Sequence, residues 1–255
     1  MKDLPAFTVL GVRVHAVQIP DVIAQMERWI AERSFGHVVV AANAHVVMEA
    51  YQNPRVRAAV NGADLVMPDG MPLVWLGRRR GFPLKERAYG PGVMAAFLRL
   101  SAGKGYRHFF YGSTPETLEA LTRRIRDLYG EVEVAGTYSP PFRPLTPEED
   151  EGVVRKLNGA KPDVLWVGLG CPKQELWMDE HRHRLRIPVL LGVGAAFDFL
   201  AGVKPQAPDW MGRHGLEWLF RLLSEPRRLW RRYLIQGAGF VYNVLGEELG
   251  LKKFD

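Results

Sequence analysis

The chain has 255 residues, of which 47% are hydrophobic and 24% are charged, and its formal net charge is +6. This composition is typical of a soluble globular protein with one large domain, or one domain and an appendage. The single cysteine, Cys171, excludes an intrachain disulfide and a zinc site built from cysteines, and it fits a reducing compartment. No stretch resembles a secretion signal or the roughly 18 apolar residues of a membrane-spanning helix. We therefore expect a cytoplasmic chain with an anionic partner, and charge alone leaves nucleic acid, nucleotide and acidic lipid open.

Short apolar runs, each followed by a Gly- or Asn-bearing turn and a helical pattern, recur along the first 203 residues. The runs cover residues 37–42, 63–67, 108–111, 163–167 and 188–191, and helices are expected at 44–51, 115–128, 147–158, 173–185 and 196–201. This alternation predicts a Rossmann-like α/β fold, with a mostly parallel sheet and helices on both faces. Ligands of such sheets bind at the carboxyl ends of the strands. We therefore expect one edge to carry Asn43, Asp69 and residues 112–114, 168–174 and 194–198.

Two proline-containing stretches interrupt this pattern. Residues 137–147 predict an ordered loop, after which Thr146 and Glu149 form the pattern of a capping box. Residues 204–210 separate the last βα unit from a segment rich in Arg and Trp. We place a Rossmann-like core at 1–203 and a helical appendage at 204–255.

The appendage combines cations with aromatic residues. Residues 213–232 contain six Arg and only two acids, and Trp218, Phe220, Trp230 and Tyr233 are interspersed with them. Arg suits phosphate, whereas Trp and Tyr favour a membrane–water boundary. Arg228 and Arg231 can share one helical face, and Arg221 comes about two turns earlier. A solvated basic helix is the usual alternative, but the aromatic residues favour an interfacial face.

Asp69 follows an apolar run and precedes a Gly turn. A partly desolvated carboxylate at such a strand end can serve as a general base with a raised pKa. The alternative is that Asp69 caps the following helix or shapes the turn.

Residues 168–175 (GLGCPKQE) form a Gly-rich turn before a helix, which suits phosphate or a sugar hydroxyl. The turn matches neither the dinucleotide-binding fingerprint nor the Walker A sequence. Gln174 and Glu175 could bond a ligand or simply begin the helix. Cys171 is expected to fill the turn rather than act as a nucleophile. Asp198 lies among apolar residues and needs a partner, either a ligand or an Arg of the appendage.

No metal site is expected. His181 and His183 do not share a helix face, and the chain has no D-x-D sequence. Phosphate would then be neutralised by Arg, with no cofactor.

In their order, these stretches resemble the WecG/TagA/CpsF family of bacterial glycosyltransferases over about residues 8–235. The resemblance rests on Asn43, Asp69-Gly70, Arg87-x-x-Gly90, Tyr111-Gly112-Ser113, Gly168-x-Gly170-x-Pro172-x-Gln174-Glu175, Gly194-x-x-Phe197-Asp198, Ala207-Pro208-x-Trp210 and Gly215 through Arg232.

The resemblance implies an inverting, metal-independent transferase attached peripherally to the inner face of the cell membrane. It implies a UDP-sugar donor and an acceptor saccharide on a polyprenyl diphosphate, in cell-wall or extracellular polysaccharide synthesis. UDP-N-acetylmannosamine is the favoured donor and UDP-glucose the second candidate, because the chain departs from the family pattern. Ala41 and Gln206 stand where Thr and Arg are usual, Met71-Pro72 replaces Ile-Gly, and Pro91-Gly92 stands where an acidic residue is common. The core is expected to self-associate.

The resemblance also implies roles for individual residues. Asp69 would be the general base, and Asn43 would hold a sugar. Gln174 and Asp198 would contact the donor nucleotide, and Arg221, Arg228 and Arg231 would hold the diphosphate. The other positions expected to contact substrate are Arg87, Gly112, Ser113, Gly168 and Gly170. The competing hypotheses are a nucleic-acid-binding protein and a non-catalytic membrane adaptor.

Overall fold

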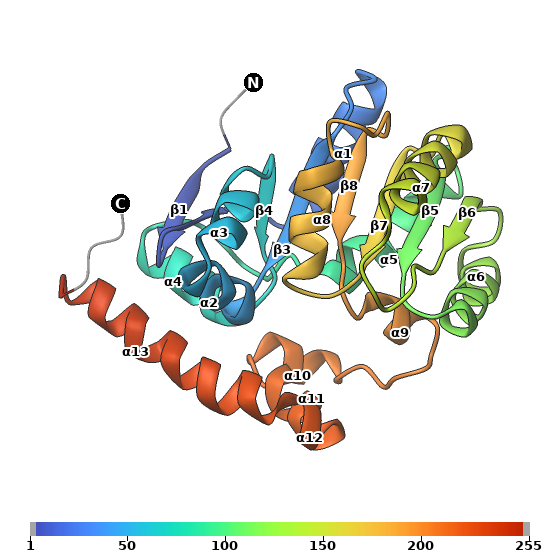
Figure 1. Cartoon of the computed structure of the whole chain (residues 1–255). Helices are drawn as coiled ribbons and strands as arrows, with labels where there is room; N and C mark the ends of the chain where they lie inside the picture. The colour runs from blue at the N-terminus through green and yellow to red at the C-terminus, as the bar shows by residue number, and fades with distance from the viewer. Residues whose placement is uncertain (1–3, 252–255) are drawn as a thin grey trace.

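The computed structural model describes residues 4–251 and centres on one parallel sheet (Figure 1). Its strands lie in the order β4-β3-β8-β7-β5-β6, and every neighbouring pair is parallel. The predicted Rossmann-like α/β fold is confirmed. The strands are β3 (His37–Ala42), β4 (Leu65–Pro68), β5 (Arg107–Gly112), β6 (Glu133–Tyr138), β7 (Val164–Gly168) and β8 (Val189–Gly192).

Helices pack on both faces of this sheet because successive strand side chains point to opposite sides. In β3, Val38 and Val40 belong to one hydrophobic core, whereas Val39 belongs to the other. The first core also packs against α2 (Ala44–Gln52), α3 (Pro54–Asn61), α4 (Met71–Arg79), α7 (Pro147–Ala160) and α8 (Lys173–His181). The second packs against α1 (Ile19–Ala31), α5 (Gly90–Ser101), α6 (Pro115–Tyr129) and α9 (Ala196–Leu200).

Three strands were not expected from the sequence. An antiparallel hairpin of β1 (Ala6–Val9) and β2 (Val12–His15) lies beside β4, where the Val66 N–H donates to His15 Nδ1 at 2.9 Å. Strand β6 lies at the edge of the sheet and is only partly buried. It also includes Thr137 and Tyr138, which the sequence assigned to a loop. An edge strand exposed on one side lacks the continuous apolar run that marked the central strands. The predicted capping box of Thr146 and Glu149 is present at α7.

The appendage crosses the edge of the sheet at which the strands end (Figure 1). It contains α10 (Asp209–Arg213), α11 (Glu217–Ser224), α12 (Pro226–Trp230), the π-helical segment η1 (Arg231–Gln236) and α13 (Gly237–Glu248). Arg80 Nη2 contacts Glu248 Oε1 at 2.8 Å and thereby fixes the far end of α13 to the core. Within residues 4–251, no helix is both long and apolar enough to cross a bilayer.

Candidate active site

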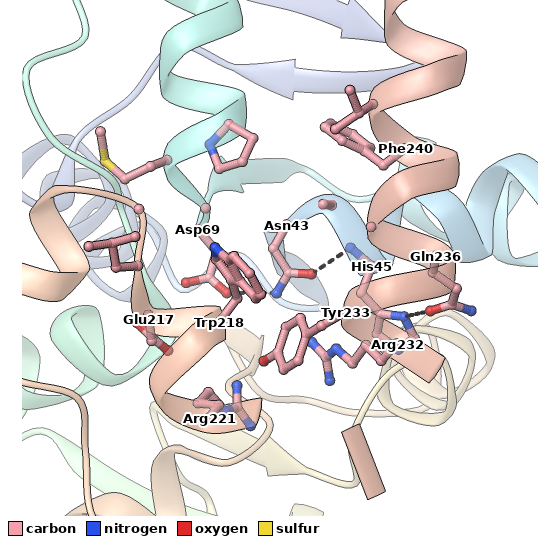
Figure 2. A pocket seen from close by; sticks show the side chains of 18 of the residues that line it. Asn43, His45, Asp69, Glu217, Trp218, Arg221, Arg232, Tyr233, Gln236 and Phe240 are labelled. Atoms are coloured by element: carbon pink, nitrogen blue, oxygen red, sulfur yellow. Dashed lines mark hydrogen bonds between the residues drawn. The ribbon is translucent and has the colours of Figure 1, made fainter. Parts of the chain in front are cut away.

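A cavity of about 560 Å³ lies between the carboxyl ends of β3 and β4 and the appendage. Its size falls within the range of small-molecule sites. Figure 2 shows its side chains arising from both parts of the chain. The core contributes Asn43, Ala44, His45, Asp69, Gly70, Met71, Pro72, Trp75 and Arg87. The appendage contributes polar and apolar groups from α10 to α13, among them Glu217, Trp218, Arg221, Arg232, Tyr233, Gln236 and Phe240.

Asn43 holds Asp69 in position at the end of the strands. The Asn43 Oδ1 atom caps α2 by accepting from the N–H groups of His45 at 3.1 Å and Val46 at 3.2 Å. Because its oxygen is occupied, Asn43 directs its Nδ2 amide group toward Asp69 Oδ2, at 3.1 Å. The Asp69 backbone N–H donates to Ala42 O at 2.7 Å. The carboxylate is therefore oriented by neighbours on both β3 and α2.

The surroundings of Asp69 favour its protonated form. Burial and the nearby Glu217 carboxylate raise the pKa of Asp69 from 3.8 to about 6, against the opposing effects of Arg87, Asn43 and Arg221. A carboxylate with this pKa is mostly ionised at neutral pH and is a stronger base than an exposed one. Helix α4 has Gly70 as its N-cap and no side-chain cap bond. The helix-capping alternative for Asp69 is therefore wrong.

An ion pair joins the core to the appendage beside Asp69. Arg87 Nη1 contacts Glu217 Oε2 at 2.5 Å, and both side chains are largely buried. The Arg87 guanidinium also lies 4.2 Å from the centre of the Tyr89 ring. Gly212 allows this arrangement, since an added Cβ there would lie 2.6 Å from Arg87 Nη2. The pair thus places a negative charge near Asp69 while fixing the start of α11.

Arg221 and Arg232 bring positive charge into the cavity. Within residues 4–251, neither guanidinium has a carboxylate oxygen within 4 Å. Arg232 is partly exposed, but its Nε atom is buried and has no hydrogen-bond partner among the described residues, and burial lowers the pKa of the guanidinium. Arg side chains stay protonated at neutral pH. Two partly buried cations that lack a carboxylate partner in the described part of the chain could bind an anion with several acceptor oxygens, such as a diphosphate.

The second link between appendage and core involves His45. Its Nδ1 donates to Gln236 Oε1 at 2.7 Å, and Gln236 Nε2 donates to Glu49 Oε1 at 2.9 Å. Burial and the Arg232 charge lower the pKa of His45 to about 4. His45 is therefore neutral at pH 7 and adds a polar group without adding charge.

The π-helical segment decides which appendage side chains face the cavity. Arg232, Tyr233 and Gln236 all lie in η1, and all three line the cavity. Wider turns of this kind are rare and occur often at functional sites. The sequence spacing had indicated only that Arg228 and Arg231 can share a helical face, and the family resemblance had assigned both to the diphosphate. Arg232 was visible only as one of six arginines, and no sequence pattern distinguished His45, Gln236 or Trp75.

The structure brings only part of the predicted set into this cavity, namely Asn43, Asp69, Arg87 and Arg221. Arg228 is exposed and contacts Glu225 at 2.7 Å. Arg231 is exposed, with its guanidinium 5.3 Å from the centre of the Trp230 ring. The three predicted arginines therefore do not meet in this cavity, because only Arg221 lines it, together with Arg232.

Other predicted residues lie on the same edge of the sheet but do not line the cavity. Gly112 ends β5 with a φ of +123°, and an added Cβ there would lie 2.6 Å from the Gly168 backbone. The Ser113 carbonyl accepts from Ser139 Oγ at 2.7 Å. Gly170 has a φ of +79° and open space beside it. Asp198 contacts Lys204 Nζ at 3.0 Å, so its partner is a cation at the start of the appendage.

Gln174 and Glu175 begin α8 and are buried. Gln174 Nε2 donates to Glu175 Oε1 at 2.9 Å, and Gln174 Oε1 accepts from the Gly194 N–H at 3.1 Å. Glu175 Oε2 has no partner among the described residues, and burial raises the pKa of this carboxyl. Burial also raises the pKa of the Cys171 thiol, which fits the expected space-filling role rather than that of a nucleophile.

Of the departures from the family pattern, Met71-Pro72 lines this cavity, whereas Ala41 and Gln206 lie outside it. Ala41 is buried within β3 and belongs to the second core. Gln206 lines a separate cavity of about 360 Å³ beside Phe199 and Arg124. Neither side chain touches the space next to Asp69.

Comparisons with known proteins agree with this architecture. Residues 7–254 match the profile of the Glycosyl transferase WecG/TagA/CpsF family. The chain is 32% identical over 217 residues to the N-acetylglucosaminyldiphosphoundecaprenol N-acetyl-beta-D-mannosaminyltransferase of Bacillus spizizenii, which covers 85% of this chain and 82% of the relative. A Staphylococcus aureus protein of the same name is 27% identical over 246 residues, covering 96% of this chain and 94% of its own. The chain belongs to the WecG/TagA/CpsF family of glycosyltransferases.

Proposed function

We propose that the protein transfers a sugar from a UDP-sugar to a saccharide carried on a polyprenyl diphosphate, with inversion at the anomeric carbon. UDP-N-acetylmannosamine is the favoured donor, because the relatives are named as N-acetylmannosaminyltransferases, and UDP-glucose is the second candidate. One observation carries the proposal. A carboxylate with a raised pKa, Asp69, lies in the same cavity as Arg221 and Arg232, which have no carboxylate partner within residues 4–251.

In the proposed reaction, Asp69 accepts the proton of the acceptor hydroxyl as its oxygen attacks the anomeric carbon of the donor. The bond between that carbon and the UDP oxygen breaks, and UDP leaves with the electron pair. Arg221 and Arg232 stabilise the growing negative charge of the diphosphate, which makes the reaction independent of a metal. The appendage covers the site and excludes water, so that donor hydrolysis is limited.

Residues on the neighbouring strand ends would hold the rest of the donor. Gln174, Asp198 and the glycine turns at 112 and 168–170 lie at the same edge of the sheet as Asp69. Backbone N–H groups and carboxylates at such an edge suit a nucleoside and its ribose. We assign the nucleotide end of the donor to this side.

The experiment is UDP release with N-acetylglucosamine on a lipid diphosphate as acceptor, each UDP-sugar tested separately, with and without a chelator. We expect acceptor-dependent release that survives chelation. Asp69→Asn should reduce turnover roughly 10²- to 10⁴-fold with UDP affinity retained, whereas Asp127→Asn on the exposed face of α6 should be neutral. Unaltered turnover in Asp69→Asn would remove this carboxylate from the chemistry.

We further propose that the outer face of the appendage attaches the protein to the inner face of the membrane. Its exposed apolar side chains include Leu223, Trp230 and Ile235, none of which lines the cavity. The exposed cations Arg227, Arg228 and Arg231 lie among them. Aromatic and basic groups together favour an interface with anionic lipid.

Sedimentation with vesicles tests this attachment. Vesicles that contain anionic lipid should bind the protein more strongly than zwitterionic vesicles, and added salt should weaken binding. Changing Arg227 and Arg228 to Glu should release the protein from anionic vesicles. Binding that ignores both lipid charge and these substitutions would refute the assignment.

A further inference from the structure

The cavity beside Asp69 has a polar half and an apolar half. Asp69, Arg221 and Arg232 lie in the polar half, whereas the other half is formed by α4 and α13. Figure 2 shows Phe240 on α13 at the opposite end of the view from Arg221 and Glu217. The apolar lining residues on these two helices are Met71, Pro72 and Trp75 on α4 and Ala238, Phe240 and Val241 on α13, and Leu216, Trp218 and Leu234 of the appendage also line the cavity.

Both walls change from polar to apolar in the same direction. On the core side, Asp69 comes immediately before α4, and Trp75 lies just over one turn into that helix. On the appendage side, Arg232 and Gln236 come immediately before α13, and Val241 follows more than one turn later. A ligand that runs along the cavity would therefore meet the carboxylate and cations first and hydrocarbon afterwards.

The apolar half has fixed walls. At its polar end, α13 is held by the hydrogen bond between His45 and Gln236, at 2.7 Å. At its other end, Glu248 contacts Arg80 at 2.8 Å and Arg79 at 3.0 Å. A helix fixed at both ends keeps the space between α4 and α13 from closing. The space is therefore a preformed groove.

Trp75 is available to a ligand in this groove. Its side chain is 48% exposed although it belongs to a core helix. Gly215 lies directly on the indole, because an added Cβ would be 2.8 Å from the ring. The φ of +73° at Gly215 also favours glycine there. The appendage thus leaves one part of the Trp75 ring open and covers another with backbone.

We propose that this groove binds the first isoprene units of the acceptor's polyprenyl chain, an inference that rests on the proposed function. In such an acceptor the sugar, the diphosphate and the chain follow one another. The sugar hydroxyl would lie at Asp69, and the chain would lie between the apolar walls of α4 and α13, whereas Arg221 and Arg232 hold the donor diphosphate. The protein itself, and not only the membrane, then recognises the lipid part of the acceptor.

The test uses soluble acceptors in solution without membranes, each below its micelle concentration. N-acetylglucosaminyl diphosphate would be esterified with methyl, dimethylallyl, geranyl or farnesyl groups. Because each buried methylene tightens binding roughly fourfold, the acceptor KM of the wild-type protein should fall at least about tenfold from methyl to geranyl. The donor KM should not change.

Two variants and one control locate the effect. Trp75→Ser and Val241→Glu should flatten the dependence of the acceptor KM on tail length, with the donor KM unchanged. Trp230→Ser removes a similarly exposed Trp, at 43%, that does not line the cavity, so its dependence should match the wild type. Light scattering of each protein shows whether a second copy occupies the groove instead.

Several results would overturn the inference. An acceptor KM independent of tail length would do so, as would an unchanged dependence in Trp75→Ser and Val241→Glu. A dimer that dissociates on Val241→Glu would assign the groove to a second copy. Absence of turnover with every acceptor and every donor would instead count against the proposed function itself.

Discussion

Replacing Asp69 by Asn should stabilise the folded protein while it reduces turnover. The pKa of Asp69 is raised from 3.8 to about 6, mainly by burial and by Glu217. A raised pKa means that the folded state favours the neutral carboxyl, so the ionised form weakens folding at neutral pH. Asn resembles the neutral form and can still accept the bond from Asn43 Nδ2, which is 3.1 Å from the carboxylate.

The size of the effect follows from the shift. A shift of about two units corresponds to about 3 kcal/mol, and partial access of solvent to the carboxylate reduces it to about 1–2 kcal/mol. For a chain of this size that gain raises Tm by about 2–8 °C. The gain depends on pH in a defined direction. It is absent below pH 3.8, grows as the pH rises from 3.8 to about 6, and is constant above that.

Denaturant unfolding of both proteins at pH 7.5 and at pH 4 measures this difference. Asp64→Asn is a control of opposite sign, because Arg182, His37 and the Val38 N–H hold the pKa of Asp64 below its ordinary value. Stability from Asp64 is present above its unfolded pKa and is lost as the pH falls, so Asp64→Asn should destabilise the protein at pH 7.5. If Asp69→Asn is no more stable than the wild type at pH 7.5, or if its gain is the same at pH 4, the environment assigned to Asp69 is wrong.

Two further predictions concern the same cavity. Because the base must be ionised, kcat/KM should fall as the pH drops below about 6. Glu217→Gln should lower the apparent pKa of this acidic fall in the pH–rate profile by about half a unit to one unit. An unchanged apparent pKa would mean that Glu217 does not act on Asp69. In calorimetry, Arg232→Gln should weaken UDP binding about ten- to a hundredfold. Arg228→Gln, on the exposed face, should change the UDP affinity less than twofold. A larger loss of UDP affinity in Arg228→Gln than in Arg232→Gln would restore Arg228 to the diphosphate site.

The buried strands and the position of Asp69 could be predicted from the sequence because they depend on local pattern. The apolar run at 37–42 became β3 with the same bounds, and Asn43 followed it as the cap of α2. Parallel strands then require that Asn43 and Asp69 share one edge. The edge strand β6 was missed because only one of its faces is covered.

The sequence by itself determined the α/β fold and the place of the Asp69 carboxylate at the carboxyl edge of the sheet. Only the tertiary structure decided which cations and polar groups surround that carboxylate. Gln236 meets His45 across 191 positions, and Arg87 meets Glu217 across 130. Such pairs depend on how the appendage docks on α2 and α4. The π-helical turn then directs Arg232, rather than Arg231, into the cavity. Local sequence periodicity predicts neither the contacts between the appendage and the core nor the orientation of Arg232, since both depend on packing between distant segments.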